Sequence, residues 1–404
     1  MAYKNVRGTR DFYPEDMNAR NKIFDSLKLT AKRFGFQEVD PPVIESLDLL
    51  KAKQGEEIIS QLFTIEKSEE LALRAEFTPS LARMFIEKQK SIAKPVKWFS
   101  LGKLFRYERP QAGRQREFFQ FNVELYGSKE VSSDAEVINL AVSSLNNLGL
   151  KEEDFKVRVN NRKLMQGILT EIGTTDEVLK IIDKKEKISE EDFKSELKSF
   201  NLDDNQIKKL TDFFNKNIEE IKTENPLAKK GLEELKTLFK YTNTIFDPTI
   251  VRGLAYYTGM VFEIFDTEKK FRSIAGGGRY EGMISLFGGE ETPAVGFGIG
   301  YSTLSLLLDY KELTPKTDNR LDYYIAVAGE DSRQKATEIC QNLRKKYNVD
   351  IDMMRRKLNK QLDFANKIAA KKVIVIGSKE LEENLVKVKD MATGDETKIS
   401  PEEL

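Results

Sequence analysis

The feature that most constrains the fold is the segment Arg116–Tyr126, in which polar and apolar residues alternate. In a strand, side chains two positions apart point to the same face. One face would carry the apolar residues Phe119, Phe121, Val123 and Leu125. The opposite face would carry Phe118, Gln120, Asn122 and Glu124. The alternation therefore predicts a strand that packs on a core through one face and presents polar groups on the other.

Four arginines lie at the start of this strand and around the Pro-Gln-Ala-Gly turn before it: Arg106, Arg109, Arg114 and Arg116. Planar guanidinium groups match pairs of phosphate oxygens, and a rigid strand holds them in fixed positions. Together with an aromatic ring, an amide and a carboxylate of the strand, they suit a site for a triphosphate, an aromatic base and a small polar ligand.

The composition limits the kind of protein. With 404 residues, of which 40% are hydrophobic, the chain is long enough for two or three domains. It has no uninterrupted apolar run of about 18 residues, so we expect no membrane span. The charged start and the single cysteine, Cys340, predict a cytoplasmic protein without a secretory signal or an intrachain disulfide. Because 66 basic residues balance 66 acidic ones, any RNA contact must use local basic patches.

The chain contains no histidine. It therefore cannot use a Ser-His or Cys-His mechanism or bind a metal through imidazole, and we expect no metal site built from its side chains. A carboxylate that attacks a phosphate needs no general base, because it is already ionised at pH 7. Activation of an amino acid by ATP is thus compatible with this composition.

The first part of the chain alternates helical and extended patterns. Residues 16–34 have the spacing of a helix, and the two prolines within residues 37–45 favour an extended segment at a sheet edge. Leu71–Thr78 alternates and predicts a strand on which Glu76 and Thr78 share a face. A carboxylate beside a hydroxyl suits the ammonium group of an amino acid, although Glu76 could instead form a salt bridge with a nearby arginine.

The pattern changes again further along the chain. Residues 163–241 are rich in charge, with apolar residues three and four positions apart, which predicts a helical insertion. Sequence typical of strands returns at residues 245–265 and 271–300. After a polar linker at residues 313–319, strands and helices alternate to the C-terminus, which predicts a compact α/β domain.

Two stretches carry a resemblance to a known family. Arg106-x-Glu108, a loop and Arg114-x-x-x-Phe118 resemble motif 2 of the class II aminoacyl-tRNA synthetases, and FRYERPQAGRQREFFQF is similar to the wording of histidyl-tRNA synthetases. The resemblance implies that Arg106 contacts the α-phosphate of ATP, that Arg114 contacts its γ-phosphate, and that Phe118 stacks on adenine. Glu108 belongs to the same implied ATP site, and Mg²⁺ would accompany the ATP.

The second resemblance is to the histidine-binding signatures of this family, in VRGLAYYTG (residues 251–259) and AGGGRYE (residues 275–281). It implies that Arg252, with Arg106, is catalytic and neutralises charge on the reacting carboxylate and α-phosphate. Tyr257 would hydrogen-bond the imidazole, with Glu124 across the pocket. The other implied histidine-binding residues are Glu76, Thr78, Gln120, Tyr256 and Tyr280.

The resemblance covers essentially the whole chain and implies its organisation. The fold would be α+β, with a class II antiparallel-sheet catalytic domain in residues 1–320 and an α/β anticodon-binding domain in residues 321–404. Residues 37–45 resemble motif 1, which this family uses at its homodimer interface. The partners would be histidine and tRNA(His), and the helical insertion would contact the acceptor arm unless its charges are only solvated.

Three positions are implied to contact tRNA. Gln111, in the motif 2 loop, would lie near the acceptor end. Arg355 and Arg356 would contact the anticodon, although a solvated basic patch would have the same sequence.

The chain departs from the family pattern at two places. Ala255 stands where aspartate is usual, and Ser302-Thr303 stands where motif 3 usually has Glu-Arg. These departures leave an alternative open, a non-catalytic, histidine-sensing regulatory subunit of ATP phosphoribosyltransferase. The C-terminal α/β domain and the retained arginines argue against this alternative. A pure RNA-binding or stress-sensing module is a third possibility, which the neutral net charge and the crowded set of polar residues disfavour.

Overall fold

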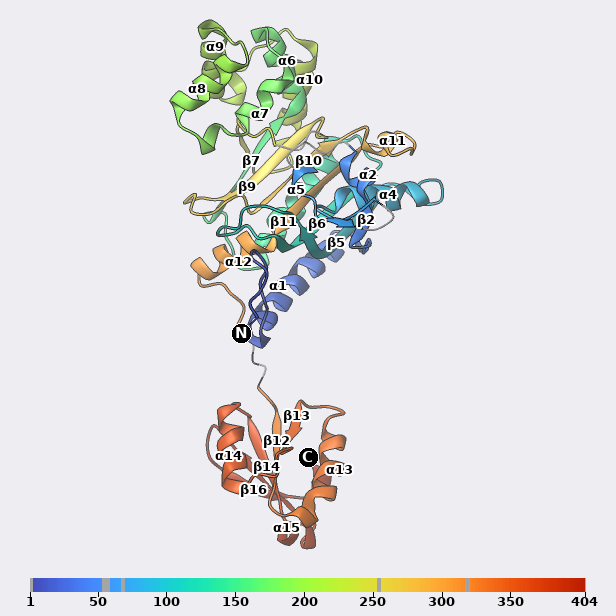
Figure 1. Ribbon diagram of the computed structural model, residues 1–404, viewed down its shortest axis with the longest axis vertical. Helices are drawn as coiled ribbons and strands as arrows, with labels where there is room; N and C mark the ends of the chain where they lie inside the picture. Colours follow the sequence, from blue (N-terminus) through green and yellow to red (C-terminus); the bar gives the residue numbers. More distant parts are fainter. Residues whose placement is uncertain are drawn as a thin grey trace. The chain divides into compact units, whose positions relative to one another are not determined.

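The computed structural model describes residues 3–52, 59–66, 70–252, 256–316, 318 and 320–403. Its chain forms two compact units, Met1–Pro315 and Lys316–Leu404 (Figure 1). Each unit has hydrophobic cores of its own, so each is described by itself.

The larger unit is built on an eight-stranded sheet in the order β1-β5-β6-β11-β10-β9-β7-β8. The pairs β1–β5 and β7–β8 are parallel, and the other neighbours are antiparallel. The strands are β1 (Gln37–Glu38), β5 (Val96–Phe105), β6 (Glu117–Tyr126), β7 (Phe155–Asn161), β8 (Ile245–Phe246), β9 (Met260–Asp266), β10 (Ala275–Tyr280) and β11 (Ala294–Gly300). With the separate C-terminal unit, this sheet confirms the predicted α+β fold.

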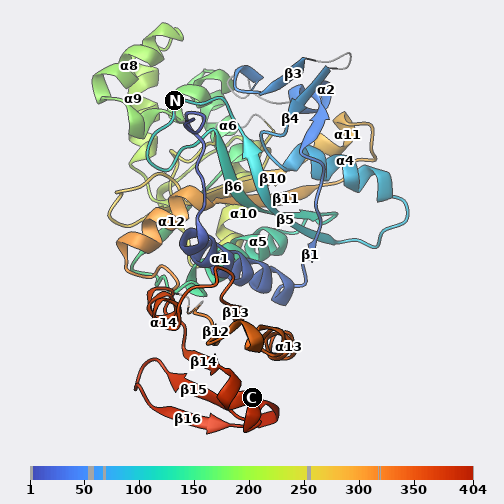
Figure 2. The ribbon, with the colours of Figure 1, turned by 60° about the horizontal axis from the view of Figure 1, so that its bottom comes forward.

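Helices α1 (Pro14–Arg33) and α5 (Val131–Asn146) lie against one face of this sheet (Figure 2). Helix α1 begins at a proline, whose fixed φ suits a first helical turn, and it has acidic residues in that turn. Apolar residues of both helices share a core with Phe121, Val123 and Leu125 of β6. The opposite face of β6 is therefore the one left for polar side chains.

The short helices α11 (Met283–Leu286) and α12 (Tyr301–Tyr310) flank β11 in sequence. A second, three-stranded sheet has the order β2-β4-β3. Its strands and the helices beside it are β2 (Ile44–Ser46), β3 (Thr64–Glu66), β4 (Glu70–Leu73), α2 (Leu47–Lys51) and α4 (Thr78–Lys88). The extended segment predicted for residues 37–45 is thus divided between β1 and β2, each at an edge of its own sheet.

The strand predicted for Leu71–Thr78 is wrong in its second half. Strand β4 ends at Leu73, and Thr78 is the first residue of α4. The backbone leaves the sheet at Arg74, whose buried guanidinium donates to the carbonyl of Lys103 at 3.1 Å. Pro79 then favours a helical first turn, because its ring fixes φ near the helical value.

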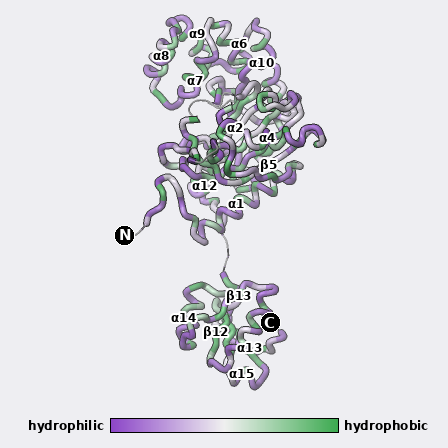
Figure 3. The backbone as a smooth tube through the Cα atoms, turned by 45° about the vertical axis from the view of Figure 1, so that its right-hand side comes forward, coloured by the Kyte–Doolittle hydropathy of each residue, from purple (hydrophilic) through white to green (hydrophobic). Residues whose placement is uncertain are grey.

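The helical insertion lies between β7 and β8. Its α-helices are α6 (Arg162–Ile172), α7 (Leu179–Ile182), α8 (Glu190–Ser199), α9 (Asp204–Phe214) and α10 (Pro226–Leu238). Its short 3₁₀ helices are η1 (Asp176–Val178), η2 (Lys185–Lys187) and η3 (Ile218–Glu220). Hydrophobic and hydrophilic segments alternate along these helices (Figure 3), as the spacing of apolar residues predicted.

The smaller unit has a five-stranded sheet in the order β13-β12-β14-β15-β16. The strands are β12 (Tyr323–Val327), β13 (Val349–Ile351), β14 (Lys372–Ile376), β15 (Val386–Asp390) and β16 (Glu396–Ile399), and the helices are η4 (Glu330–Ser332), α13 (Arg333–Leu343), α14 (Leu358–Lys367), α15 (Ser378–Glu382) and η5 (Pro401–Glu403). Residues of α13 and α14 belong to different core clusters, on opposite faces of the sheet. In the described parts of both units, no helix combines the length and the apolar character that a membrane span requires.

Candidate active site

The polar face of β6 lines a cavity of about 160 Å³. Gln120, Asn122 and Glu124 reach it from β6, while the alternate residues of the strand pack in the core. All the predicted histidine-binding residues line this cavity: Glu76, Thr78, Gln120, Glu124, Arg252, Tyr256, Tyr257 and Tyr280. Glu76 and Thr78 therefore meet in one site although they do not share a strand.

Glu124 is the most buried carboxylate of the cavity, with 1% of its surface exposed. Its Oε1 atom accepts hydrogen bonds from Thr78 Oγ1 at 2.7 Å and Asn122 Nδ2 at 2.9 Å, and its Oε2 atom accepts one from the Tyr280 hydroxyl. Burial raises the pKa of Glu124 to about 7, although these hydrogen bonds favour the ionised form. A carboxylate can accept about four hydrogen bonds, so Oε2 retains the capacity for a further donor.

A second carboxylate and two phenols form another side of the cavity. The Tyr256 hydroxyl donates to Glu76 Oε2 at 3.1 Å, and the rings of Tyr256 and Tyr257 lie 4.8 Å apart. Burial raises the pKa of Tyr257 to about 12 and that of Tyr256 well above its ordinary value. Both phenols therefore keep their protons at neutral pH and can act as hydrogen-bond donors.

Glycines of β11 leave room for these polar side chains. Gly296 lies opposite Glu124 in the sheet, and a Cβ on Gly296 would lie 2.2 Å from Glu124 Oε2. A Cβ on Gly298 would lie 2.4 Å from Gln120 Nε2. The sequence did not single out Asn122 or these two glycines as site residues. A signal was present for the glycines, because Gly296 and Gly298 are two positions apart in PAVGFGIG, the same period as the polar face of β6.

A larger cavity of about 750 Å³ adjoins the first and shares Arg106, Gln120 and Arg252 with it. Arg114, Arg272 and Lys269 also line it, which makes its walls rich in cations. Residues of the helical insertion contribute to the same cavity: Ile182, Asp183, Glu186 and Lys187. The insertion therefore takes part in the site as well as in the fold.

Phe118 lines a third cavity of about 120 Å³, together with Arg106, Glu108 and Arg114. The guanidinium of Arg106 lies 5.5 Å from the centre of the Phe118 ring, and its Nε donates to the carbonyl of Ala75 at 2.9 Å. Glu108, 8% exposed, is paired with Arg114 through its Oε2 atom and lies 4.0 Å from Arg106. One carboxylate thus holds both motif 2 arginines toward the same space.

Arg252 forms an ion pair with Glu263 on β9, a residue that sequence reasoning did not select. Burial lowers the pKa of Arg252, but the charge and hydrogen bond of Glu263, together with Tyr257 and Tyr256, more than offset this effect, and the net pKa is raised. The sequence signal for Glu263 was its position as a charged residue within an otherwise apolar strand segment, VFEIF (residues 261–265).

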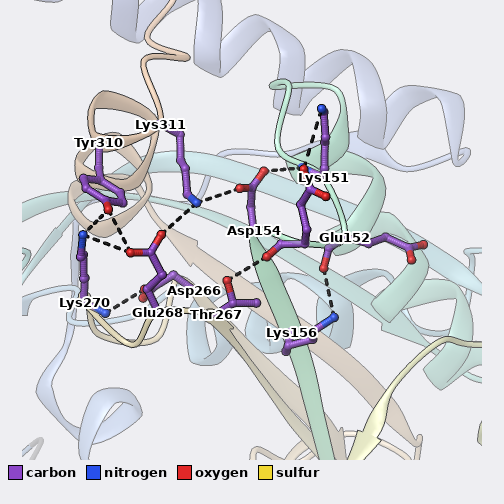
Figure 4. Close-up of polar contacts among 11 residues, drawn as sticks. Lys151, Glu152, Asp154, Lys156, Asp266, Thr267, Glu268, Lys270, Tyr310 and Lys311 are labelled. Carbon is purple, nitrogen blue, oxygen red and sulfur yellow. Dashed lines mark hydrogen bonds and ion pairs between the residues drawn. The ribbon is translucent and has the colours of Figure 1, made fainter.

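The wall formed by residues 266–275, between β9 and β10, is anchored on its outer side (Figure 4). Glu268 accepts hydrogen bonds from the Tyr310 hydroxyl at 2.9 Å and from Lys311 at 3.2 Å, and Lys311 also pairs with Asp154 at 2.9 Å. Lys270 is bonded to the Tyr310 hydroxyl and pairs with Glu268 at 3.1 Å. These contacts tie the loop to the end of α12 and to the residues before β7.

Two of the three residues that depart from the family pattern, Ser302 and Thr303, line different cavities of the larger unit. Thr303, 5% exposed, lies on α12 and lines the larger cavity, while Ser302 lines the cavity of Phe118. The Thr303 Oγ1 atom is 3.2 Å from where a Cβ of Gly113 would lie, so this position faces the motif 2 loop. Ala255 lies outside the described residues.

The predicted tRNA-binding residues belong to different compact units, and each unit is described by itself. Gln111 is exposed in the motif 2 loop and forms a β-bridge with Arg114. Arg355 and Arg356 line a cavity of about 170 Å³ in the smaller unit. Arg356 pairs with Asp352 at 2.9 Å, and Arg355, whose side chain is 73% exposed, pairs with Glu330 at 3.1 Å.

Within the described residues, no group of three or more histidine, cysteine, aspartate or glutamate side chains is placed to hold a metal ion. Mg²⁺ usually keeps several waters and is held by one or two carboxylates together with substrate phosphates. The cations that line the larger cavity suit phosphate groups.

An antiparallel sheet that presents paired arginines beside two adjoining cavities, with a helical insertion and a separate α/β unit, is the arrangement implied for a class II aminoacyl-tRNA synthetase. The comparison with protein families makes the assignment more specific. The chain belongs to the histidyl-tRNA synthetase family, whose profile matches residues 8–304. The profile of an anticodon binding domain matches residues 322–404.

Relatives of nearly equal length support this assignment. A histidine–tRNA ligase of Natronomonas pharaonis is 38% identical over 98% of this chain and 96% of its own length. One of Pyrococcus horikoshii is 37% identical over 99% of this chain and 97% of its own length. The solved histidyl-tRNA synthetase of Staphylococcus aureus aligns with a TM-score of 0.75 at 26% identity, covering 99% of this chain and 98% of that one.

Proposed function

We propose that this protein joins histidine to tRNA(His) in two steps. Histidine and ATP first give histidyl-adenylate and pyrophosphate, and the histidyl group then passes to the terminal adenosine of the tRNA. The observation that carries this proposal is the meeting of all the predicted histidine-binding residues around one cavity, which shares two arginines with the larger, cation-rich cavity.

The cavity lined by the polar face of β6 suits histidine. The α-ammonium group would bind Glu76, Thr78 and Gln120, since the first supplies charge and the others supply oxygen acceptors. The imidazole would lie between Glu124 and Tyr257. A neutral imidazole has one donor and one acceptor, which match a carboxylate oxygen and a phenolic hydroxyl.

The larger cavity and the cavity of Phe118, which share Arg106 and Arg114, suit ATP. Arg106 would bind the α-phosphate, Arg114 the γ-phosphate, and Phe118 would stack on adenine beside Glu108. Guanidinium groups bind phosphates through paired, charge-assisted hydrogen bonds. Mg²⁺ would be held chiefly by the phosphates, where it would neutralise part of their charge.

The first reaction needs positioning and charge stabilisation more than proton transfer. The carboxylate oxygen of histidine forms a bond with the α-phosphorus, and the bond from that phosphorus to the oxygen bridging it to the β-phosphorus breaks. The nucleophile is ionised at neutral pH, so no base is required. Arg252 and Arg106 line both cavities and would stabilise the charge on the α-phosphoryl oxygens as it develops.

The contacts with tRNA are also proposals. Residues 1–320 would form the catalytic domain and residues 321–404 the anticodon-binding domain. Gln111 would contact the acceptor end, and Arg355 and Arg356 the anticodon. We further propose a cytoplasmic homodimer whose interface includes residues 37–45.

The regulatory alternative is less well supported. Histidine–tRNA ligases match this chain along nearly all of their length. The match of the C-terminal unit to an anticodon binding domain supports a role in tRNA binding. Thr303 remains the feature that such an alternative would explain, and Arg272, which lines the same cavity, offers a cation in its place.

The test of the complete function is aminoacylation. The purified chain, ATP, Mg²⁺ and histidine are incubated with a tRNA(His) transcript or, as a control, with a transcript for another amino acid. We expect histidine to become attached to tRNA(His) alone. Histidine binding without attachment to either transcript would favour the regulatory alternative.

A further inference from the structure

Two residues of the sheet determine where the guanidinium of Arg252 lies. Glu263 on β9 and Gly276 on β10 are paired across the sheet. The Arg252 Nη1 atom is bonded to Glu263 Oε1. A Cβ on Gly276 would lie 2.4 Å from Arg252 Nη1 and 2.7 Å from Arg252 Cζ. The guanidinium thus occupies the space over this pair, which we name the Arg252 seat.

We propose that Glu263 is the positioning residue for Arg252, and that its carboxylate and the space left by Gly276 fix the guanidinium at the boundary of the two cavities. The proposal rests on the proposed function, in which Arg252 stabilises the reacting carboxylate and α-phosphate. Glu263 itself does not contact the reacting atoms; it acts through Arg252.

Burial and backbone geometry both indicate that the position of Arg252 is imposed. Its side chain is 20% exposed and that of Glu263 is 17% exposed. Arg252 has a φ of +59°, a left-handed conformation that is uncommon for a residue with a side chain. Such a backbone conformation persists only where surrounding contacts determine it. The ion pair with Glu263 and the close approach to Gly276 are two contacts of this kind.

The seat also leaves donors for the substrate. A guanidinium has five N–H donors, and the bond to Glu263 uses the Nη1 atom. The Arg252 Nε atom is buried and has no hydrogen-bond partner among the described residues, so the donors left for a substrate are on the two terminal nitrogens. A guanidinium held on one side by a carboxylate can thus present its remaining donors in a fixed direction, and a displacement of about 1 Å can lower a rate about 100-fold.

The test measures histidine-dependent exchange of pyrophosphate with ATP for the full-length chain, four single variants and the double variant Glu263→Gln/Gly276→Ala. Glu263→Gln removes the charge, and Gly276→Ala fills the seat without changing any charge. Glu263→Asp restores the charge on a shorter side chain. Glu136→Gln is the matched control, because it breaks a half-buried ion pair with Lys97, 2.6 Å long, that lies outside the described cavities.

We expect Glu263→Gln and Gly276→Ala each to lower kcat about 100-fold and to change the KM for histidine less than about threefold. The double variant should be little slower than either single variant, because both changes displace the same guanidinium. Glu263→Asp should recover at least about tenfold of the lost kcat. The control should stay within about twofold of the wild type, and all variants should keep the wild-type circular dichroism spectrum.

Several results would overturn the inference. Wild-type kcat in Glu263→Gln, or additive losses in the double variant, would show that Glu263 does not act through Arg252. Recovery of Glu263→Gln at higher Mg²⁺ concentration would make Glu263 a metal ligand. If Glu263→Gln does not fold, the test rests on Gly276→Ala. A wild-type kcat in Gly276→Ala would then contradict the proposed positioning of Arg252. Absence of exchange in the wild type would instead refute the proposed function, and this inference with it.

Discussion

Three hydrogen-bond donors reach the carboxylate of Glu124: Thr78 from α4, Asn122 from β6 and Tyr280 from β10. Water would otherwise solvate this group, and its removal raises the pKa to about 7. The residue is therefore divided between its neutral and ionised forms near neutral pH. The ionised form only accepts hydrogen bonds, whereas the protonated form also donates one, so the ionised form is better suited to the N–H of a neutral imidazole.

This pKa predicts how histidine use depends on pH. The ionised fraction of a group with a pKa of about 7 rises about tenfold between about pH 6 and about pH 8. We expect the ratio of kcat/KM for histidine, wild type over Glu124→Gln, to rise by that factor over this range. The ratio cancels the titration of free histidine. A ratio that falls with pH would show that the protonated carboxyl is the binding form.

Arg272 provides a test of how the site works without an arginine at position 303. It lines the larger cavity, as Thr303 of α12 does. We expect Arg272→Ala to raise the KM for ATP about tenfold, the effect of losing about 1.4 kcal/mol of phosphate binding. Lys270→Ala is the control, since it removes a cation of the same loop that is bonded to Tyr310 (Figure 4). Equal effects of both variants would contradict a specific phosphate contact.

At the residue scale, some contacts could be predicted and others could not. The alternation of β6 was enough to place Gln120 and Glu124 on one polar face. Gly296 and Glu263 were not predicted, because their importance comes from which strands become neighbours. β11 pairs with β6, and β9 pairs with β10, and neither pairing can be derived from the pattern of a single strand.

At the scale of elements, the segment after β4 shows how tertiary contacts override a local pattern. The alternation of Leu71–Thr78 predicted a continuous strand, but Arg74 is drawn into buried contacts with backbone carbonyls and Pro79 begins a helix. Glu76 and Thr78 still reach the same cavity. The two side chains therefore line one cavity, as their predicted shared face required, although the element proposed to carry them was wrong.

The packing of α6 against α10 leads to a testable prediction at the scale of elements. A Cβ on Gly231 would lie 2.4 Å from the backbone nitrogen of Leu164, which cannot move without moving α6. We expect Gly231→Ala to lower the free energy of unfolding by about 1–3 kcal/mol, despite the higher helix propensity of alanine. Thermal unfolding followed by circular dichroism measures the effect.

The control for this variant is Lys230→Ala, at an exposed position next to it on α10. It should change the free energy of unfolding by less than about 0.5 kcal/mol. A rise in the stability of Gly231→Ala would show that α6 and α10 are not in close backbone contact.

At the scale of the whole molecule, the two compact units predict separable activities. The described cavities that we assign to histidine and ATP are formed by residues before Pro315. A fragment of residues 1–315 should therefore keep histidine-dependent pyrophosphate exchange within about threefold of the full chain. Its charging of tRNA(His) should fall at least about tenfold, as expected if the anticodon contacts contribute 1.4 kcal/mol or more. Loss of exchange in a folded fragment would contradict this division of roles.

The order of helical and extended patterns predicted the broad architecture well. The helical insertion and the C-terminal α/β unit were recognisable because their periodicities differ from those of the flanking sequence. Strand β16 was not predicted, since all of Glu396–Ile399 except the last residue is polar and its pairing with β15 supplies the structure. The domain boundary at residue 320 stays a prediction, and the compact units divide between Pro315 and Lys316.

The most direct test of the account is ATP–pyrophosphate exchange by the purified wild-type chain with each proteinogenic amino acid in turn. We expect exchange with histidine alone, because Glu76, Glu124 and Tyr257 together match the charge and the hydrogen-bond pattern of this amino acid. Histidine binding, measured by calorimetry, without exchange would contradict the proposed activation of histidine, and Thr303 would then be the first position to replace with arginine.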